Sequence, residues 1–297
     1  MTAVIQKMSN KLYHEHLSIS RSQLMVYLRS PEEYKARYVD CTIEPRHPND
    51  SMVFGTMVDQ WLTEDILPSP NLPDGVVELP LECLNKNGGR IASRISAWLH
   101  ERGEAYRAGT LPEVKKAWTP VEVKRWRTAA AENVKVLTLI DAQIDMSKAA
   151  RHFLRAESLK QQSIFWEWQG VQCKVRPDFL LMDEAIVDLK TSRGVDARTM
   201  QRSCIDYGYD VQAAMCQLAV KELVGEDLPF AIVAVHNEPP YEIEVYQMED
   251  DMISYGRERA SDALHGIAAD HYHSASHGKV TSLLLPRWAN KESNHDN

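Results

Sequence analysis

The sequence predicts a single mixed α/β domain, with a helical N-terminal half and a central mixed β-sheet flanked by helices. Helix-start signals and amphipathic runs dominate the first 155 residues. Three short apolar runs of strand length follow between residues 161 and 191, and two more lie between residues 230 and 248. An apolar helical run over residues 207–225 separates the two groups of strands, so helices and strands alternate as in an α/β or α+β fold.

Two helices are expected early in the chain. Ser20 and Gln23 stand at the spacing of a capping box, which predicts that a helix starts there. Residues 51–67 carry an apolar stripe at helical spacing, and Gly55 and Asp59 lie one turn apart on another face of that helix. A glycine within a helix costs roughly 1 kcal/mol relative to alanine, so we expect a close approach at Gly55.

The middle of the chain is a connector followed by a long helical stretch. Residues 66–90 are a connector rich in proline, glycine and asparagine, and a helix is expected around residues 91–104. Whether residues 66–120 form an inserted lobe is open. Thr119 and Glu122 form a second capping box with proline at the first helical position, and helical sequence then continues to about Leu154.

The central hairpin is the part of the sequence that carries chemistry. It runs from Lys174 to Thr191, with a turn at Asp183-Glu184. Side chains alternate along a strand, so Asp188 and Lys190 share one face, and the hairpin brings Asp178 beside them.

Two interpretations of these charges are open. A half-exposed hairpin can carry Asp188 and Lys190 as a solvated ion pair, and short matches of this kind are usually no more than that. Alternatively, two adjacent carboxylates repel unless a cation lies between them, and their oxygens suit Mg²⁺ or Mn²⁺. Such a metal activates water for phosphodiester hydrolysis, while a lysine stabilises the transition state.

Composition limits the other function classes. The chain has 297 residues, a net charge of −8 and a pI near 5.8, which argues against coating of nucleic acid through bulk charge. Five scattered cysteines form no C-x-x-C pair, so neither zinc nor a disulfide framework is indicated. We expect a cytoplasmic protein, because no secretory signal or membrane span is evident.

Four segments in order make the chain resemble the PD-(D/E)XK nuclease superfamily, specifically its RecE (exonuclease VIII)-like branch related to RecB-type nuclease domains. They span about residues 17–220: LSISRSQLMVYLRSPEEYKARYV, FGTMVDQWLTE, RPDFLLMDEAIVDLKT and YDVQAAMCQLAV. The resemblance implies a restriction-endonuclease-like core. It places the nuclease domain over residues 18–272, after a lead of residues 1–17 and before a flexible tail of residues 273–297.

The resemblance also implies roles for individual residues. Asp178 and Asp188 become metal-binding carboxylates, with the Leu189 carbonyl as a further ligand. Lys190 becomes the catalytic lysine. Gln212 lies beside the site, where it contacts the DNA backbone or the attacking water.

The sequence departs from the family pattern at two positions. Asp59 stands where the family has a metal-binding histidine, and we expect it to bind Mg²⁺ or Mn²⁺ equally well because hard cations prefer oxygen. Cys216 stands where the family has a tyrosine. The chain lacks the cysteine set of iron–sulfur relatives, so no cluster is expected.

The resulting function is a metal-dependent exonuclease that acts on the ends of linear double-stranded DNA. The family implies 5′–3′ digestion for annealing recombination in phage, with a RecT-type annealing protein as partner and a ring-shaped homo-oligomer. Arg176 and Arg193 flank the motif, and each is either a phosphate contact or a structural residue. The alternatives are a nuclease-fold DNA-binding protein with little catalysis, or a structure-specific or single-strand nuclease.

Overall fold

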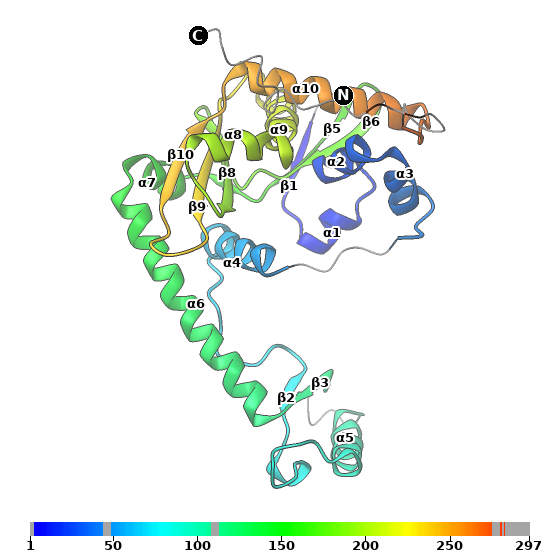
Figure 1. The fold of residues 1–297 in the computed structure, drawn as a ribbon, viewed down its shortest axis with the longest axis vertical. Coiled ribbons are helices and arrows are strands. Elements are labelled where there is room, and N and C mark those ends of the chain that lie inside the picture. The colour runs from blue at the N-terminus through cyan, green and yellow to red at the C-terminus, as the bar shows by residue number, and fades with distance from the viewer. Residues whose placement is uncertain (1–2, 44–48, 108–112, 275–279, 281, 283–297) are drawn as a thin grey trace.

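The computed structural model describes residues 3–43, 49–107, 113–274, 280 and 282. These residues form a layered body and a long arm that extends from one edge of it (Figure 1). The predicted tail of residues 273–297 lies almost wholly outside the described residues. No helix in the described part is long and apolar enough to cross a membrane.

The main sheet of the body is five-stranded and mixed. Its order is β10-β9-β8-β7-β4, with β8 and β9 parallel and the other neighbours antiparallel. The strands are β4 (Leu159–Lys160), β7 (Phe179–Leu181), β8 (Ala185–Ser192), β9 (Phe230–His236) and β10 (Ile243–Gln247). Strand β8 is therefore central, and the predicted central mixed sheet is confirmed.

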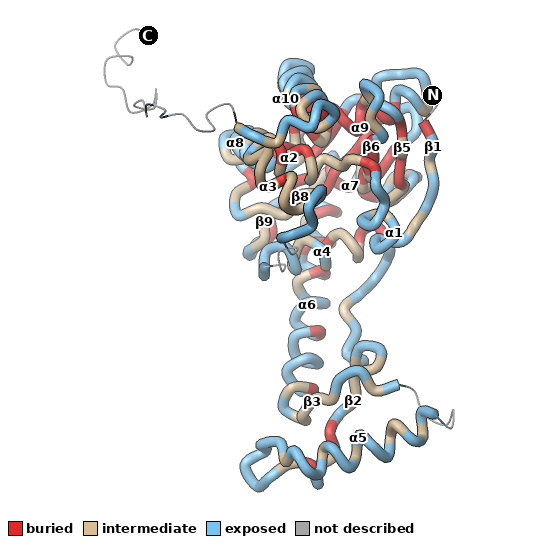
Figure 2. Tube along the Cα trace, turned by 90° about the vertical axis from the view of Figure 1, so that its right-hand side faces the viewer, coloured by how far each residue is buried: buried red, intermediate tan, exposed pale blue. Residues whose placement is uncertain are grey.

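Helices cover both faces of this sheet, so each face has its own core (Figures 1 and 2). Along β8, Ile186 packs into one core, whereas Val187 and Leu189 pack into the other. This is the alternation expected for a strand that is buried on both sides. One core includes residues of α8 (Ala197–Asp206), α9 (Tyr209–Val224) and α10 (Asp250–Ala268), and the other includes residues of α4 (Asp50–Glu64), α6 (Pro120–Met146) and α7 (Lys148–Arg155).

A second, three-stranded sheet corrects the single long hairpin predicted from Lys174 to Thr191. Its order is β1-β5-β6, with strands β1 (Val4–Gln6), β5 (Ser163–Trp168) and β6 (Val171–Val175). The first apolar run of the hairpin is divided at Arg176-Pro177, because proline has no N–H to donate to a ladder. Strand β6 therefore pairs with β5, and only β7 forms the hairpin with β8.

The N-terminal residues are part of the folded body rather than a separate lead. Strand β1 pairs with β5, and α1 (Asn10–Glu15) follows it. The capping box of Ser20 and Gln23 is confirmed at the start of α2 (Arg21–Arg29), where the Ser20 N–H donates to Gln23 Oε1 at 2.8 Å. Helix α3 (Pro31–Tyr34) and a π-helical turn (Lys35–Val39) complete this region.

The arm comprises residues 66–107 and 113–135. It contains β2 (Val76–Glu78), a 3-10 turn (Leu81–Cys83), α5 (Ala92–Arg107), β3 (Lys116–Trp118) and the first half of α6, whose Thr119–Glu122 capping box is confirmed. Strands β2 and β3 pair in parallel. Figure 2 shows the arm largely exposed, and no residue of α5 is buried. Its buried apolar residues are Leu79, Cys83, Val123 and Ala130.

Helices α9 and α10 approach closely because a glycine lies at their contact. A Cβ atom at Gly256 would lie 2.1 Å from the backbone oxygen of Asp210, so only glycine fits there. The Asp210 side chain is fully buried and accepts a hydrogen bond of 2.6 Å from Arg259 Nη1. Breaking a buried pair of this kind is costly, so this contact fixes α9 against α10.

Gly256→Ala is expected to destabilise the body by at least about 1–3 kcal/mol, because the added methyl group overlaps the α9 backbone. The measurement is the urea midpoint followed by circular dichroism. Gly103→Ala is the matched control: it makes the same change within a helix, but no atom lies within 4 Å of the new Cβ. The control should keep or raise the midpoint. Equal midpoints for Gly256→Ala and the wild type would contradict this account of the packing.

Candidate active site

The register of the hairpin places Asp178 opposite Asp188. Phe179 pairs with Val187, so the residue before β7 faces the residue after Val187 on β8. Asp178 is half-buried, and its Oδ2 atom accepts a hydrogen bond of 2.7 Å from the backbone N–H of Leu189. The predicted juxtaposition of the two carboxylates is therefore present in the structure.

Asp188 is the most buried charge of the site. Its side chain is only 2% exposed and forms an ion pair with Lys190 two residues along β8. Gln212, one turn into α9, donates from Nε2 to Asp188 Oδ1 at 2.6 Å. No other hydrogen bond within the described residues reaches Asp188 Oδ2. Three of the sequence-predicted residues thus meet on the α9 side of the sheet.

Lys190 is held as an ammonium group. Burial alone lowers its pKa, but the charges of Asp188 and Asp178 outweigh burial and raise it above its ordinary value. The Nζ atom also lies 4.9 Å from the centre of the Tyr209 ring, a cation–π distance. The side chain is 15% exposed. Lys190 therefore presents a positive charge in a fixed position, and its side chain is partly accessible to solvent.

Helix α4 brings Asp59 to the site through a close approach to β8. A Cβ atom at Gly55 would lie 2.9 Å from Thr191 Oγ1, so a larger residue would push the helix away from the strand. This is the approach expected for Gly55. Asp59 lies one turn further along α4 and is half-buried.

Gln161 joins Asp59 to Asp178, a role that sequence reasoning missed. Its Nε2 atom donates to Asp59 Oδ1 at 3.0 Å and to Asp178 Oδ1 at 2.9 Å. Gln161 lies between β4 and β5 in the left-handed region (φ 51°), and its N–H donates to the Asp178 carbonyl at 3.1 Å. The three residues are far apart in the chain, so no local pattern signals the contact.

Burial and neighbouring carboxylates disfavour the charged forms of Asp59 and Asp178. Burial, followed by the charge of Asp188, raises the pKa of Asp59 to about 6. Burial and the charges of Asp188 and Asp59 likewise raise the pKa of Asp178 well above its usual range. A site that raises the pKa of its acids in this way is one that a cation would stabilise.

The donor chemistry fits a hard divalent cation, since the site offers carboxylate oxygens, and Asp188 Oδ2 has the Lys190 ammonium group beside it. As the side chains lie, however, no group of three or more His, Cys, Asp or Glu in the described residues is arranged to hold one ion. The side-chain amides of Gln161 and Gln212 donate to these carboxylates instead. Metal binding by Asp59, Asp178, Asp188 and the Leu189 carbonyl stays a prediction.

A cavity of about 320 Å³ adjoins the site beyond Gln212. Arg21 donates from Nη2 to Gln212 Oε1 at 3.3 Å, and Cys216 also lines the cavity. Burial raises the pKa of the Cys216 thiol, which therefore stays neutral. Tyr13 of α1 lines the same cavity, so a tyrosine from the N-terminal residues lies near the position where the family pattern has one.

The two flanking arginines differ. Arg176 Nε and Nη2 donate to Ser163 Oγ at 3.0 and 2.9 Å, Nη1 donates to Asn10 Oδ1 at 2.8 Å, and the guanidinium lies 4.0 Å from the centre of the Tyr13 ring. These contacts are those of a structural residue that anchors α1. The exposed Arg193 side chain has no hydrogen bond or ion pair within the described residues, so its contact with DNA stays a prediction.

Comparisons with known proteins agree with this architecture. Residues 20–274 match the model of a family described as a PDDEXK-like domain of unknown function (DUF3799). No curated protein matches the chain. A solved structure described as a putative exonuclease from Eubacterium rectale is similar in fold, with a TM-score of 0.54 and 16% identity over 95% of this chain and 97% of that one. An alkaline exonuclease from Laribacter hongkongensis gives a TM-score of 0.25 and 15% identity over 44% of this chain and 68% of that one, too low to carry an argument.

Asp59→Asn is expected to stabilise the metal-free protein at neutral pH. The folded state holds the Asp59 pKa near 6, above its ordinary 3.8, so wild-type stability falls as pH rises through this window. The variant lacks this loss. Its free energy of unfolding should therefore exceed that of the wild type by on the order of 1–3 kcal/mol above pH 6, and should equal it below pH 4. The measurement is thermal unfolding in EDTA at several pH values.

Asp65→Asn provides the control for this measurement. Asp65 is exposed at the C-terminal end of the same helix, and asparagine tolerates its left-handed backbone. The control should follow the wild-type pH profile. A constant gain for Asp59→Asn at every pH would show that the carboxylate charge is not its cause.

Proposed function

The chain belongs to the PDDEXK-like family whose model it matches over residues 20–274, and from this premise we propose that it is a metal-dependent deoxyribonuclease that hydrolyses phosphodiester bonds of linear double-stranded DNA. The observation that carries the proposal is the site around β8. Asp178 and Asp188 face each other across the hairpin, and Lys190 lies on the same strand face as Asp188. Carboxylates beside a lysine that stays protonated suit hydrolysis of a phosphodiester, because the lysine stabilises the negative charge of the transition state.

Each residue has a task that its surroundings support. Lys190 keeps its proton, so it stabilises negative charge on the phosphate oxygens and does not act as the base. Gln212 orients Asp188 through Oδ1, and the Leu189 N–H orients Asp178 through Oδ2. Asp59 and Asp178 are half-buried, so these two residues keep part of their surface exposed to solvent.

A divalent metal, Mg²⁺ or Mn²⁺, would be held by Asp59, Asp178, Asp188 and the Leu189 carbonyl, and it would supply a water of lowered pKa and neutralise charge on the phosphate. The raised pKa values of Asp59 and Asp178 support this assignment, because a cation would relieve the repulsion that contributes to them.

The finer part of the proposal is exonuclease action on DNA ends. It draws on the RecE-like pattern of the sequence, and the similar fold of a protein described as a putative exonuclease is consistent with it. The same pattern suggests 5′–3′ digestion for annealing recombination, a RecT-type annealing protein as partner and a ring-shaped oligomer.

A second candidate is a DNA-binding protein with this fold and little catalysis. The observation that favours it is that Gln161, Gln212 and Lys190 already satisfy the acids, while no three His, Cys, Asp or Glu side chains of the part that the structure describes are arranged around one ion. Binding of Mg²⁺ separates the two functions, because a binding protein does not require metal at these aspartates.

We expect the purified protein to degrade linear duplex DNA with Mg²⁺ or Mn²⁺ and to leave a covalently closed circle intact. EDTA should abolish the activity. Asp188→Asn removes a carboxylate and Lys190→Met removes the fixed charge, so each should lower the rate by on the order of 10²–10³-fold. The measurement is release of acid-soluble nucleotides from labelled DNA.

Asp183→Asn is the matched control for this assay. It makes the same change as Asp188→Asn, on the exposed β7–β8 turn, and should retain wild-type activity. Cutting of the circle would replace exonuclease with endonuclease action. DNA binding without any cutting would contradict the proposed nuclease activity and favour the second candidate function.

A further inference from the structure

The far end of the arm concentrates positive charge in an acidic protein. Residues 115–127, KKAWTPVEVKRWR, contain five lysines and arginines and a single acid, whereas the whole chain carries a net charge of −8. These residues form β3 and the first turns of α6, so they are neighbours in space as well as in sequence. We name five of them the basic patch: Lys115, Lys116, Lys124, Arg125 and Arg127.

The cations of the patch are not neutralised by the arm itself. All five are exposed, and none has an ion-pair partner among the described residues. The two nearby acids of α6 are already paired, since Glu122 binds Arg90 at 2.9 Å and Glu132 binds Lys135 at 2.8 Å. Glu78 of β2 lines the same groove as Lys124 and Arg127, so the five cations outnumber the nearby acid without a partner among the described residues. The charge of the patch is thus available to an external anion.

Two tryptophans give the patch a rigid base. The rings of Trp118 on β3 and Trp126 on α6 lie 5.5 Å apart, and Trp126 Nε1 donates to the Asn71 carbonyl at 3.0 Å. Lys116 Nζ lies 5.7 Å from the centre of the Trp118 ring. The backbones that carry the cations are therefore fixed relative to one another.

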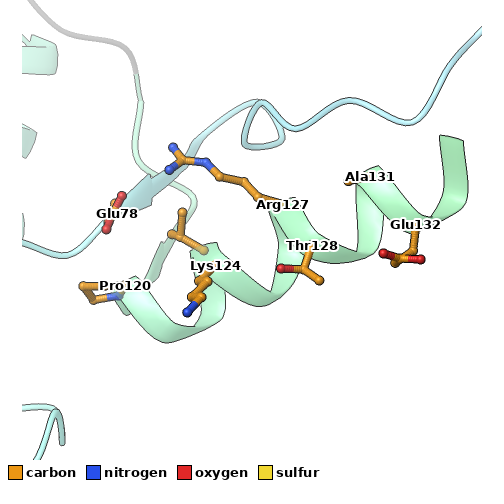
Figure 3. Close-up of a pocket in the computed structure, with 8 residues that line it drawn as sticks. Glu78, Pro120, Lys124, Arg127, Thr128, Ala131 and Glu132 are labelled. Atoms are coloured by element: carbon orange, nitrogen blue, oxygen red, sulfur yellow. The ribbon is translucent and has the colours of Figure 1, made fainter. Parts of the chain in front are cut away.

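The patch has the shape of an open surface rather than of a pocket for a small molecule. Figure 3 shows Arg127 reaching from α6 toward β2, while Lys124 points away from it. Both line a shallow groove of about 380 Å³ that also contains Glu78 and Glu132. A shallow, open groove flanked by several cations suits an extended polyanion lying across the arm better than a single enclosed phosphate.

The arm is connected directly to the active site. Helix α4 carries Asp59, ends at Glu64 and leads into the arm, and Figure 1 shows α4 at the edge of the body from which the arm extends. Helix α6 has 27 residues, which corresponds to a length of roughly 40 Å. At about 3.4 Å per base pair, this is the length of about 12 base pairs of duplex.

We propose that the basic patch binds the phosphate backbone of double-stranded DNA whose end lies in the active site, on the order of one helical turn away from the reacting phosphate. This inference rests on the proposed function. The patch supplies affinity for DNA without sequence preference, and it engages only duplexes long enough to reach it.

The test is binding of blunt 30- and 10-base-pair duplexes in EDTA, measured by fluorescence anisotropy at several salt concentrations. The variant combines Lys124→Gln, Arg125→Gln and Arg127→Gln. Each lost phosphate contact lowers the salt slope by about 0.9, so we expect a decrease of about 2 to 3 and at least a tenfold weaker affinity for the 30-mer. The affinity of the patch variant for the 10-mer should equal that of the wild type.

The matched control combines Lys7→Gln, Lys148→Gln and Arg198→Gln, which remove the same charge from exposed, unpaired positions of the body. Equal losses in both triple variants would overturn the proposal, because total charge would then explain them. Wild-type binding by the patch variant, with a changed sedimentation coefficient, would assign the patch to a second copy of the chain and would also overturn it.

The same experiment separates this inference from the proposed function. If the wild type neither binds nor cuts DNA, both fail. If the wild type cuts DNA and the patch variant binds each of the two duplexes as tightly as the wild type does, only the inference fails. Far-UV circular dichroism and the three single variants, each with a partial loss, check that the triple variant is folded.

Discussion

The structure depends on the burial of one carboxylate in the middle of its central strand. Asp188 is 2% exposed on a strand that is packed on both faces. An isolated charge there would be very costly, so neighbouring groups must compensate it. Strand β8 itself supplies Lys190, and α9 supplies Gln212. The surroundings of β8 follow from this requirement as much as from apolar packing.

The remaining acids make the site less stable than it would otherwise be. Asp178 and Asp59 could relax by separating, yet the Leu189 N–H holds Asp178, and the close approach at Gly55 holds the helix that carries Asp59. Gln161 bridges the two with a neutral amide, which satisfies the carboxylates without neutralising them. Elements that keep like charges together against their repulsion are consistent with the proposed cation site, because stability alone would favour their removal.

The sequence predicted the parts of the site that depend on local periodicity. Alternation along β8 and the short hairpin are sufficient to group Asp178, Asp188 and Lys190, and the helix signals placed Gln212 and Gly55 correctly. Gln161 and Tyr13 escaped prediction because their contacts are long-range and their local sequences are ordinary. The division of the hairpin at Pro177 was missed because two apolar runs look alike whether their strands share one sheet or belong to two.

Charge is segregated along the molecule, and the segregation has a physical consequence. The carboxylates of the site and the net charge of −8 repel a polyanion, so the body attracts DNA less strongly than the basic patch does. A basic surface at the far end of the arm overcomes this repulsion without disturbing the site, since α6 alone is roughly 40 Å long, whereas the Debye length at physiological salt is about 8 Å. The arm can therefore hold a duplex while the pKa values of the acids stay set by their own neighbours. Binding of DNA requires positive charge, whereas the proposed metal site requires carboxylates. The two tasks therefore suit separate elements of the chain, the arm and the body.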